Sequence, residues 1–437
     1  MKKIKKSRAL CVCLALLLLA GSGLLGVRQY RSPERSLDVR NGEGQNLSLQ
    51  NLSAETAKTE KTSAAPTSGG EETNSSGSGL VIAAKSAVLM DAGTGAVLFR
   101  QNEKKELPPA SVTKIMTMLL VLEAVDAGKI RLDDSVTISE RAAGMGGSQM
   151  YMEPGEQHTM EELMKGIAMV SANDACAAAA EHVSGSVEIF VEKMNRRAAE
   201  LGMENTHFVN TNGLPASNHY SSAYDIALMS KELLLHADGH SWFTTWQDTI
   251  RIGLPGKETE FGLTNTNKLI KQYPGAIGLK TGYTADAGYC LSGVAKRENR
   301  TLIAVVMGCE TSAVRLAEIR QLLDYGFANY DTVILSRKGG IVEKISLPKG
   351  SPQEINAVSP EEISVLIQKE EPASVTGEAI LYPNLELPLK KGDPVGEFRV
   401  LKDGEEVAVK PLVSDQNVRK ATVGEMYQRI LRTLLEE

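Results

Sequence analysis

A segment that is apolar on every side, residues 111–122, constrains the fold of this chain more than any other feature. Its large apolar side chains leave no polar face on a helix: Ile115, Met116, Met118, Leu119, Leu120, Val121 and Leu122. A helix that is apolar all round lies in the centre of a domain rather than on its surface. We therefore predict a helix here that other elements enclose, so that polar side chains at its start share water-poor surroundings.

The elements around this helix follow an order that is typical of an α+β domain. A β-hairpin is predicted at residues 87–99, and helical stretches follow from about residue 160 to 203. Two strands at 289–295 and 301–307 and an amphipathic helix at 315–330 come last. Strands, helices, strands and a helix in that order predict an antiparallel sheet in which the N-terminal hairpin joins the late strands.

The N-terminus predicts export. Basic residues precede an apolar run at residues 9–20 and small residues follow it, as in a signal peptide. The apolar stretch extends to Val27 and approaches membrane-spanning length, so residues 1–27 are either a signal peptide or a signal-anchor. We assign residues 28–79 to a disordered linker, because residues 59–79 are rich in Ser, Thr, Gly and Glu and have no large apolar residue. We expect the folded part to act outside the cytoplasm, at the cell membrane or cell wall.

Two parts follow the α+β domain, to which we assign residues 80–331. Residues 332–414 alternate short β-branched runs with turn residues and predict a small all-β domain without a catalytic constellation. Residues 415–437 predict an amphipathic helix that begins with a capping box at Thr422 and Glu425. Two interpretations of this helix stay open: it lies on a membrane surface, or it packs on the β-domain.

Charge and composition exclude several partners and cofactors. The net charge of −6 argues against nucleic acid as the main partner. His236 and His240 are spaced by four, but the Asp-Gly pair between them favours a loop, so we expect no metal and no cofactor. Beyond the N-terminal segment, Cys176, Cys290 and Cys309 are dispersed. Free buried thiols are favoured over a Cys290–Cys309 bridge.

Ser111 and Lys114 lie one helical turn apart at the start of the apolar helix. A serine hydroxyl is a poor nucleophile until a base takes its proton. A lysine is such a base only when its amine is neutral, and both burial and a second cation favour the neutral form. The helix would supply the burial and Lys280 the second cation. Taken alone, the pair also fits an ordinary helix cap and a surface lysine.

Ser171 and Asn173 form a second pattern, at the start of another helical stretch. Ser171 would relay a proton between Lys114 and a leaving group. Asn173 would donate a hydrogen bond to an amide carbonyl of the substrate and steady the lysine. Helix capping explains both residues equally well when they are considered alone.

Lys280, Thr281 and Gly282 form a third pattern, on a strand predicted at residues 276–283. A peptide can add to the edge of such a strand through main-chain hydrogen bonds. Lys280 and Thr281 would then bind the carboxylate at the C-terminus of that peptide. The alternative is an ordinary turn at a strand end, and it is the conjunction of the three patterns in this order that favours chemistry.

With their flanking residues, these patterns resemble the D-alanyl-D-alanine carboxypeptidases of the low-molecular-mass penicillin-binding proteins. Four segments carry the resemblance: residues 109–117, 171–176, 201–208 and 278–284. The resemblance runs from about residue 80 to 330. It implies a β-lactamase/transpeptidase-like α+β fold with an antiparallel sheet between helices.

The resemblance also implies a reaction. Ser111 would attack the carbonyl between the last two D-alanines of a peptidoglycan stem peptide, with Lys114 as the general base. The backbone amides of Ser111 and Tyr283 would form the oxyanion hole, and penicillins would acylate the same serine. The implied substrate-binding residues are Lys280, Thr281, Gly282 and Tyr283.

Three alternatives share parts of this pattern. A class A β-lactamase usually has Asp at the position of Ala172 and lacks the all-β domain. A D,D-endopeptidase resembles this layout but tends to lack the β-domain. A non-catalytic penicillin-binding protein would be expected to lose Ser111, Lys114 or Lys280, and this chain has all three.

Overall fold

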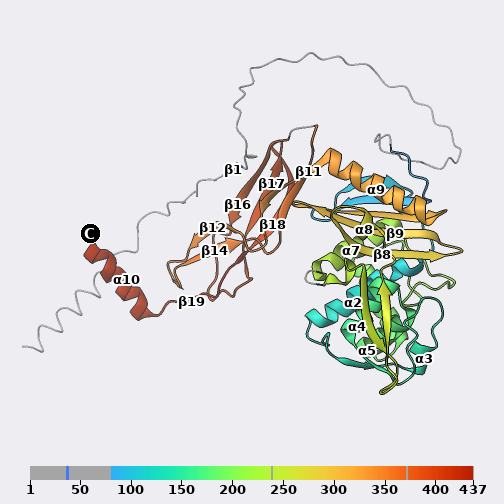
Figure 1. Ribbon diagram of the computed structural model, residues 1–437. Coiled ribbons are helices and arrows are strands. Elements are labelled where there is room, and N and C mark those ends of the chain that lie inside the picture. The colour runs from blue at the N-terminus through green and yellow to red at the C-terminus, as the bar shows by residue number, and fades with distance from the viewer. Residues whose placement is uncertain (1–35, 39–79, 238–239, 371–372, 437) are drawn as a thin grey trace, which may run out of the picture.

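The computed structural model describes residues 36–38, 80–237, 240–370 and 373–436 (Figure 1). The predicted signal segment, residues 1–27, lies outside the described residues. Of the predicted linker, residues 28–79, the structure describes one short strand, β1 (Ser36–Asp38). The described part of the first domain begins at Leu80. This strand pairs antiparallel with a strand of the C-terminal domain.

A five-stranded antiparallel sheet forms the middle of the first domain, in the order β3-β2-β10-β9-β8. The N-terminal hairpin joins the late strands because β2 pairs with β10, as the sequence predicts. β8 lies at one edge of the sheet. The five strands are β2 (Ser86–Asp91), β3 (Val97–Gln101), β8 (Ala276–Thr284), β9 (Gly288–Arg297) and β10 (Arg300–Cys309).

Successive side chains of the strands point to opposite faces of the sheet and belong to two apolar clusters. Both faces are therefore apolar, and helices cover each of them. One cluster packs under α9 and the other contains α2, α5 and α7, so the domain has three layers (Figure 1). The main helices are α2 (Lys114–Asp126), α4 (Met160–Lys165), α5 (Asn173–Ser184), α6 (Val187–Glu200), α7 (Ala223–His236) and α9 (Ser312–Asn329).

Shorter elements connect these layers. Two small hairpins lie outside the main sheet and pair β4 with β5 and β6 with β7. The short elements are η1 (Ala110–Thr113), β4 (Ser135–Thr137), α3 (Glu140–Ala143), β5 (Gln157–Thr159), η2 (Gly166–Val170), η3 (Ser241–Phe243), β6 (Gln247–Ile252), β7 (Thr259–Thr264) and α8 (Leu269–Gln272).

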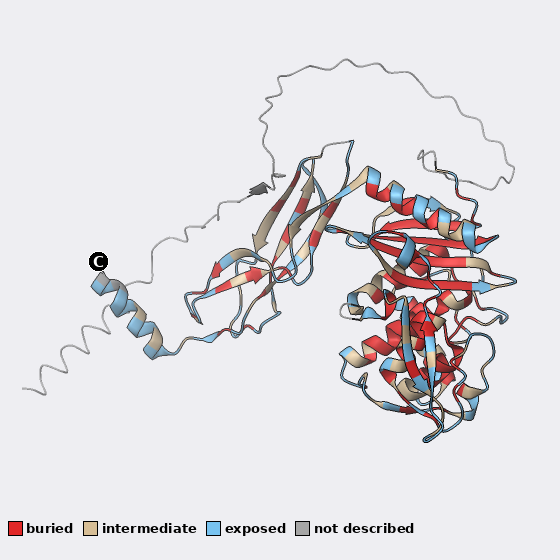
Figure 2. Ribbon diagram, viewed as in Figure 1, coloured by how far each residue is buried: buried red, intermediate tan, exposed pale blue. Residues whose placement is uncertain are grey.

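The apolar segment is the central helix of the domain, as predicted. Every residue of α2 from Lys114 to Leu122 is buried, and Figure 2 shows this helix in the colour of buried residues. Burial on all sides explains why the sequence has no polar face there. One buried residue is a lysine, Lys114, whose side chain is fully removed from solvent.

The C-terminal domain is all β, as predicted. A six-stranded sheet has the order β1-β16-β17-β18-β14-β12, and β11 pairs with β15 beside it. Phe398 lies in the centre of its core, packed over Gly377. The strands are β11 (Tyr330–Ser336), β12 (Ile341–Ser346), β13 (Gly350–Ser351), β14 (Glu354–Val358), β15 (Ile363–Gln368), β16 (Val375–Leu381), β17 (Pro394–Lys402), β18 (Glu405–Ser414) and β19 (Arg419–Lys420).

The last helix, α10 (Val423–Glu436), begins with the predicted capping box. The Thr422 amide donates to the Glu425 carboxylate over 2.7 Å, and the Glu425 amide donates to the Thr422 hydroxyl over 3.3 Å. Its apolar residues face solvent (Figure 2): Val423, Met426, Tyr427, Ile430, Leu431, Leu434 and Leu435. The apolar face therefore does not pack on the β-domain, although the helix contacts that domain through Arg429, which donates to the carbonyl oxygens of Pro348 and Gly350. Among the described residues no helix has the length and apolar character needed to cross a membrane.

Candidate active site

Ser111 lies in η1, the short 3-10 turn that leads into the buried helix. The Nζ atom of Lys114 is 2.9 Å from Ser111 Oγ, and it also donates to the carbonyl oxygen of Asn212 over 2.7 Å. Ala110, just before the serine, has a left-handed φ of 48°. Strained backbone of this kind is held in place by its surroundings and clusters at functional sites. The predicted pair of hydroxyl and amine is thus in direct contact.

Burial lowers the pKa of the Lys114 amine to about 8. The charge is disfavoured because α2 removes the amine from water, while Cys176 and Asp174 limit the fall. At neutral pH about one amine in ten is therefore neutral and able to accept a proton. This places Lys114 in the range that a general base requires.

Lys280 extends from the edge strand β8 into the same buried region, where its Nζ donates to the Thr281 carbonyl over 3.1 Å. Burial, and then the charge of Lys114, lower the pKa of Lys280 well below its usual range. The charge of Lys114 thus lowers the pKa of Lys280, whereas the lowered pKa of Lys114 itself comes from burial, so the predicted effect of Lys280 on Lys114 stays a prediction. A carboxylate that reached Lys280 would supply the missing counter-charge.

Gly282 lets β8 approach the nucleophile turn closely. A Cβ atom at this position would lie 2.9 Å from the Pro109 carbonyl oxygen and 3.1 Å from the Val112 nitrogen. Next to it, Thr281 Oγ1 is 2.8 Å from Thr266 Oγ1. Tyr283 is half-exposed, and its ring centroid is 4.3 Å from that of Tyr289. The strand that carries the four predicted residues therefore lies against the nucleophile turn at Gly282.

Ser171 and Asn173 are buried at the start of α5, and each has an oxygen without a hydrogen-bond partner among the described residues: Ser171 Oγ and Asn173 Oδ1. The Asn173 amide group donates instead to the Gly146 carbonyl over 2.6 Å. Buried polar atoms without a partner are costly, and an active site retains them for a ligand.

The structure corrects one predicted contact of this pair. Neither side chain hydrogen-bonds Lys114 in the part of the chain that the structure describes. The partner that steadies the lysine is the backbone carbonyl of Asn212, which comes from a loop 98 residues away in sequence. The expected roles of Ser171 and Asn173 toward the lysine therefore lack a direct bond.

His219 was not singled out from the sequence but touches the nucleophile turn. The Val209 amide donates to its Nδ1 over 2.9 Å, so Nε2 carries the proton and faces Thr113 Oγ1 at 2.9 Å. Burial lowers the pKa of His219 to about 4, and the imidazole is neutral at physiological pH. It holds Thr113 between the serine and the lysine.

Arg315, at the start of α9, is a second residue that the sequence did not indicate. Its Nη1 atom donates to the carbonyl oxygens of Gly282 and Cys290 over 3.4 and 3.3 Å. Its guanidinium lies 5.6 Å from the centroid of the Tyr289 ring. This adds a permanent positive charge behind the strand that carries Lys280.

The three cysteines are free and buried, as the sequence favoured. The alternative of a Cys290–Cys309 bridge is wrong. Burial raises the pKa of Cys176 to about 12 and that of Cys290 to about 11, so neither forms a thiolate readily. Cys176 lies close to the lysines without being a nucleophile.

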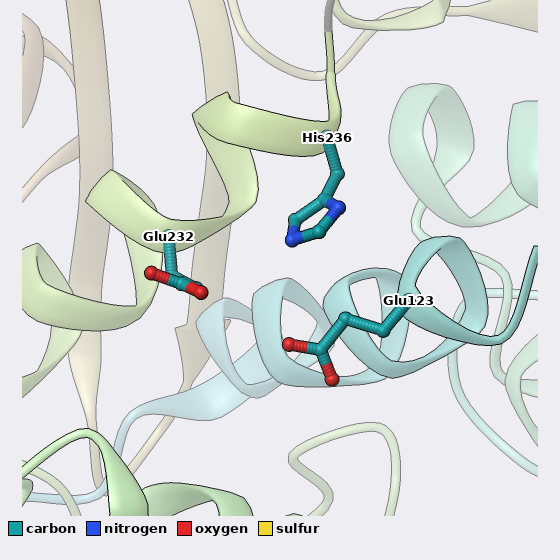
Figure 3. Close-up of side chains that lie close together, drawn as sticks. All are labelled: Glu123, Glu232 and His236. Carbon is teal, nitrogen blue, oxygen red and sulfur yellow. The ribbon is translucent and has the colours of Figure 1, made fainter. Parts of the chain in front are cut away.

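Glu123, Glu232 and His236 gather at the far end of α2 and α7 (Figure 3), with ligand atoms within 4.8 Å of one another. The guanidinium of Arg197 donates to both carboxylates, over 2.8 and 2.6 Å. These acids therefore already have a cation, and the group is an ion-pair network that joins α2, α6 and α7. The predicted loop at His236 is wrong, because this residue ends α7.

Gly213 supports the nucleophile turn by leaving space for it. Its φ is +86°, and a Cβ here would run into the Ala110 carbonyl and lie 2.9 Å from the Ser111 nitrogen. We expect Gly213→Ala to displace Ser111, slow acylation by at least about tenfold and lower the free energy of unfolding by about 1–3 kcal/mol. Penicillin acylation rates and urea denaturation measure the two effects.

Gly256 offers a matched control for this change. Its φ is +82°, but a Cβ there meets nothing within 4 Å. Gly256→Ala should cost only the strain of a left-handed residue, about 1–2 kcal/mol, and leave acylation unchanged. Equal acylation rates for the two variants would contradict the role given to Gly213.

Comparison with known proteins agrees with this geometry. Residues 72–311 match the profile of the D-alanyl-D-alanine carboxypeptidase family, and residues 330–420 match that of the penicillin-binding protein 5 C-terminal domain. The chain is 46% identical to the D-alanyl-D-alanine carboxypeptidase DacF of Bacillus subtilis over 339 residues, which cover 77% of this chain and 86% of that protein.

The chain belongs to the D-alanyl-D-alanine carboxypeptidase family.

Further relatives support the whole two-domain layout of this carboxypeptidase. It is 35% identical to DacC of Escherichia coli over 77% of this chain and 84% of that protein. The crystal structure of penicillin-binding protein 5 from Haemophilus influenzae matches with a TM-score of 0.62 and 32% identity, over 78% of this chain and 99% of that one. The chain is thus a serine-type D-Ala-D-Ala carboxypeptidase that acts on peptidoglycan, with a transpeptidase-like α+β domain followed by an all-β domain.

Proposed function

We propose that this carboxypeptidase shortens peptidoglycan stem peptides through an acyl-enzyme on Ser111. One observation carries the proposal: a fully buried lysine, with its pKa lowered to about 8, lies 2.9 Å from the serine hydroxyl. Such a lysine is a base at near-neutral pH and is within reach of the proton that it must take.

In acylation, Lys114 Nζ takes the Ser111 proton while Oγ attacks the carbonyl carbon of the penultimate D-alanine. The backbone amides of Ser111 and Tyr283 stabilise the oxyanion, since β8 and η1 lie against each other at Gly282. The bond to the terminal D-alanine then breaks, and its nitrogen takes up a proton. Water later attacks the ester and releases the shortened stem.

The remaining polar groups of the site bind the ends of the reacting peptide. Lys280 and Thr281 bind the terminal carboxylate, and the nearby charge of Arg315 favours an anion there. The Asn173 Nδ2 atom already donates to Gly146, so its unpartnered Oδ1 accepts from an N–H of the substrate rather than donating to a carbonyl, and Ser171 Oγ faces the departing amine. β-Lactams carry a carboxylate and a reactive amide in a similar arrangement, so they acylate the same serine.

Release of free D-alanine from a synthetic peptide that ends in D-Ala-D-Ala tests this function, with and without prior penicillin. We expect release, and penicillin should block it. Hydrolysis of penicillin without D-alanine release would instead favour a β-lactamase. A stable penicillin adduct without release would favour an endopeptidase or a binding protein.

We further propose that the enzyme is exported by residues 1–27 and rests on the membrane through α10. The support is the row of solvent-facing apolar side chains on this helix, with Val423 86% and Leu435 84% exposed. A helix with one apolar face lies in the membrane interface rather than crossing it. In the sequence, the β-domain lies between the catalytic domain and this membrane-binding helix.

Ile430→Glu should weaken binding to lipid vesicles, because Ile430 is 58% exposed on the apolar face. The change removes an isoleucine that would be buried in the membrane interface and places a charge there. We therefore expect partitioning into vesicles to be at least about tenfold weaker. Sedimentation of the chain from residue 28 with vesicles that contain anionic lipid measures this. Gln428→Glu adds the same charge at another exposed position of α10. Equal loss in both variants would indicate a charge effect rather than an apolar contact.

A further inference from the structure

One strand of the C-terminal domain lacks a neighbour on one side along most of its length. β18 pairs with β17 over residues 405–413 (Figure 1). On its other side β14 pairs only with Val413 and Ser414. Among the described residues no strand pairs with residues 405–411 on that side. Pro411 is typical of such an edge, because proline has no N–H for a ladder. The edge is therefore available to another strand.

The free part of β18 has an apolar centre between charges of opposite sign. Val407 and Val409 are 51% and 43% exposed, and Ala408 between them is half-buried. Glu406 precedes this centre and Lys410 follows it. Charged side chains on an edge usually keep other strands away. Charges of opposite sign repel only a strand that brings a like charge to each of them.

This order of residues is complementary to itself when it is reversed. Consider two copies whose β18 strands run antiparallel with the Ala408 residues opposite each other. Val407 of one copy then lies opposite Val409 of the other, and Glu406 lies opposite Lys410. The two-fold symmetry repeats both matches. Oppositely charged residues that face each other across an antiparallel ladder attract, whereas a parallel pair in register would place like charges opposite each other.

Both charges already have partners within the chain, but these ion pairs are exposed. Glu406 lies 3.3 Å from Arg399, and Lys410 lies 2.8 Å from Glu361. The four side chains are between 39% and 54% exposed. Ion pairs at such exposed sites contribute little to stability, so their members can exchange partners at low cost. The charges are therefore able to pair with a second copy.

We propose that two copies of this chain associate through the free edge of β18, antiparallel and with Ala408 opposite Ala408. The contact joins the two C-terminal sheets into one sheet across a two-fold axis. One short strand from each copy makes a small interface, so the dimer is weak and reversible in solution. It uses none of the residues assigned to the reaction, and it pairs two catalytic domains without altering either site.

Ala408→Cys tests the register, because the two new thiols would face each other. Opposite Cα atoms in an antiparallel ladder are about 4.5–5.5 Å apart, a separation that a disulfide spans. Oxidation of this variant, in the chain from residue 28, should give a disulfide-linked dimer, since the three other cysteines are buried. Ala379→Cys is the matched control and should stay monomeric. Ala379 is also a half-buried alanine packed on the core of this domain, but it lies on β16.

Charge reversal tests the pairing itself. Lys410→Glu and Glu406→Lys each place like charges opposite each other at both ends of the contact, so each should dimerise at least about tenfold more weakly than the unmodified chain. An equimolar mixture of the two variants restores opposite charges at both ends and should recover the dimer. Analytical ultracentrifugation measures all three samples. Release of D-alanine by either variant should be unchanged, and this shows that its catalytic domain is folded.

The same experiments can overturn the proposal. It fails if Ala408→Cys gives no more disulfide-linked dimer than Ala379→Cys. It also fails if both charge variants associate like the unmodified chain, or if their mixture recovers nothing. Association that persists in Lys410→Glu but is lost in Ile430→Glu would assign the contact to the apolar face of α10 instead of β18.

Discussion

Replacing Ser111 by alanine is expected to abolish both D-alanine release and covalent labelling by penicillin. The change removes the only atom in the proposed reaction that bonds to the substrate, and Lys114 would lose the hydroxyl 2.9 Å from its amine. Loss of a serine nucleophile costs on the order of 10⁶ in kcat where it has been measured, and only binding and oxyanion stabilisation remain. Mass spectrometry of the intact protein after incubation with penicillin measures the adduct.

Ser135→Ala is the control for this experiment, because Ser135 is an exposed serine on β4. It should be labelled as fast as the unmodified enzyme. An adduct that persists in Ser111→Ala would mean that another residue is the nucleophile, and peptide mapping of that adduct would identify it. The fold of Ser111→Ala should be intact, since the hydroxyl is small and only half-buried.

Replacing Lys114 by alanine is expected to slow acylation by about 10²–10⁴-fold, the usual contribution of a general base. The pH profile adds a second readout. The lowered pKa of about 8 means that the amine becomes neutral as pH rises, so acylation should increase from pH 6, reach half its plateau near that pKa and level off roughly one pH unit above it. Lys114→Ala should lose this dependence. Stopped-flow acylation across that range measures both effects.

Lys114→Ala also removes a large buried side chain and leaves the Asn212 carbonyl without its donor. We expect a loss of about 2–5 kcal/mol in the free energy of unfolding, so circular dichroism must show that the variant is folded. Lys129→Ala changes an exposed lysine just after α2 and should alter neither rate nor stability. Near-normal acylation by folded Lys114→Ala would remove the lysine from the base role.

The fold could be predicted where burial of a segment requires a clear pattern of apolar residues in the sequence. The apolar segment that becomes α2 and the alternating runs of the β-domain are both of this kind. α7 was not predicted, although Ser222 caps it through the Asp225 amide. Its buried residues include Ser230, which hydrogen-bonds Ser292 across the layer. Buried polar residues such as Ser230 interrupt the apolar spacing that predicts a helix, because their hydrogen-bond partners are known only from the folded structure.

The hairpin of β6 and β7 was missed for a related reason. Most of its residues are exposed or half-exposed, so packing against the core did not impose a clear alternation on the sequence. Alternation of apolar and polar residues indicates a strand only when one face of that strand is buried. A hairpin with little buried surface therefore gives a weak alternation.

In the candidate site, contacts between residues that are close in sequence could be predicted, and contacts between distant residues could not. The pair of Ser111 and Lys114 could be predicted because one helical turn brings the two residues together. The carbonyl of Asn212 and the guanidinium of Arg315 could not, since tertiary packing alone brings them to the site from distant positions. Sequence spacing therefore pointed to the groups that we propose to react, and the structure added the groups that contact them.

The free thiols described above have a consequence for how the enzyme matures. Within the described residues no covalent cross-link holds the fold, and all three cysteines are buried. Noncovalent contacts carry its stability: packing of the domain cores, hydrogen bonds and ion pairs such as those of Arg197. If the chain is exported as proposed, folding of its described part thus requires neither an oxidant nor a disulfide isomerase, in reducing and in oxidising surroundings alike.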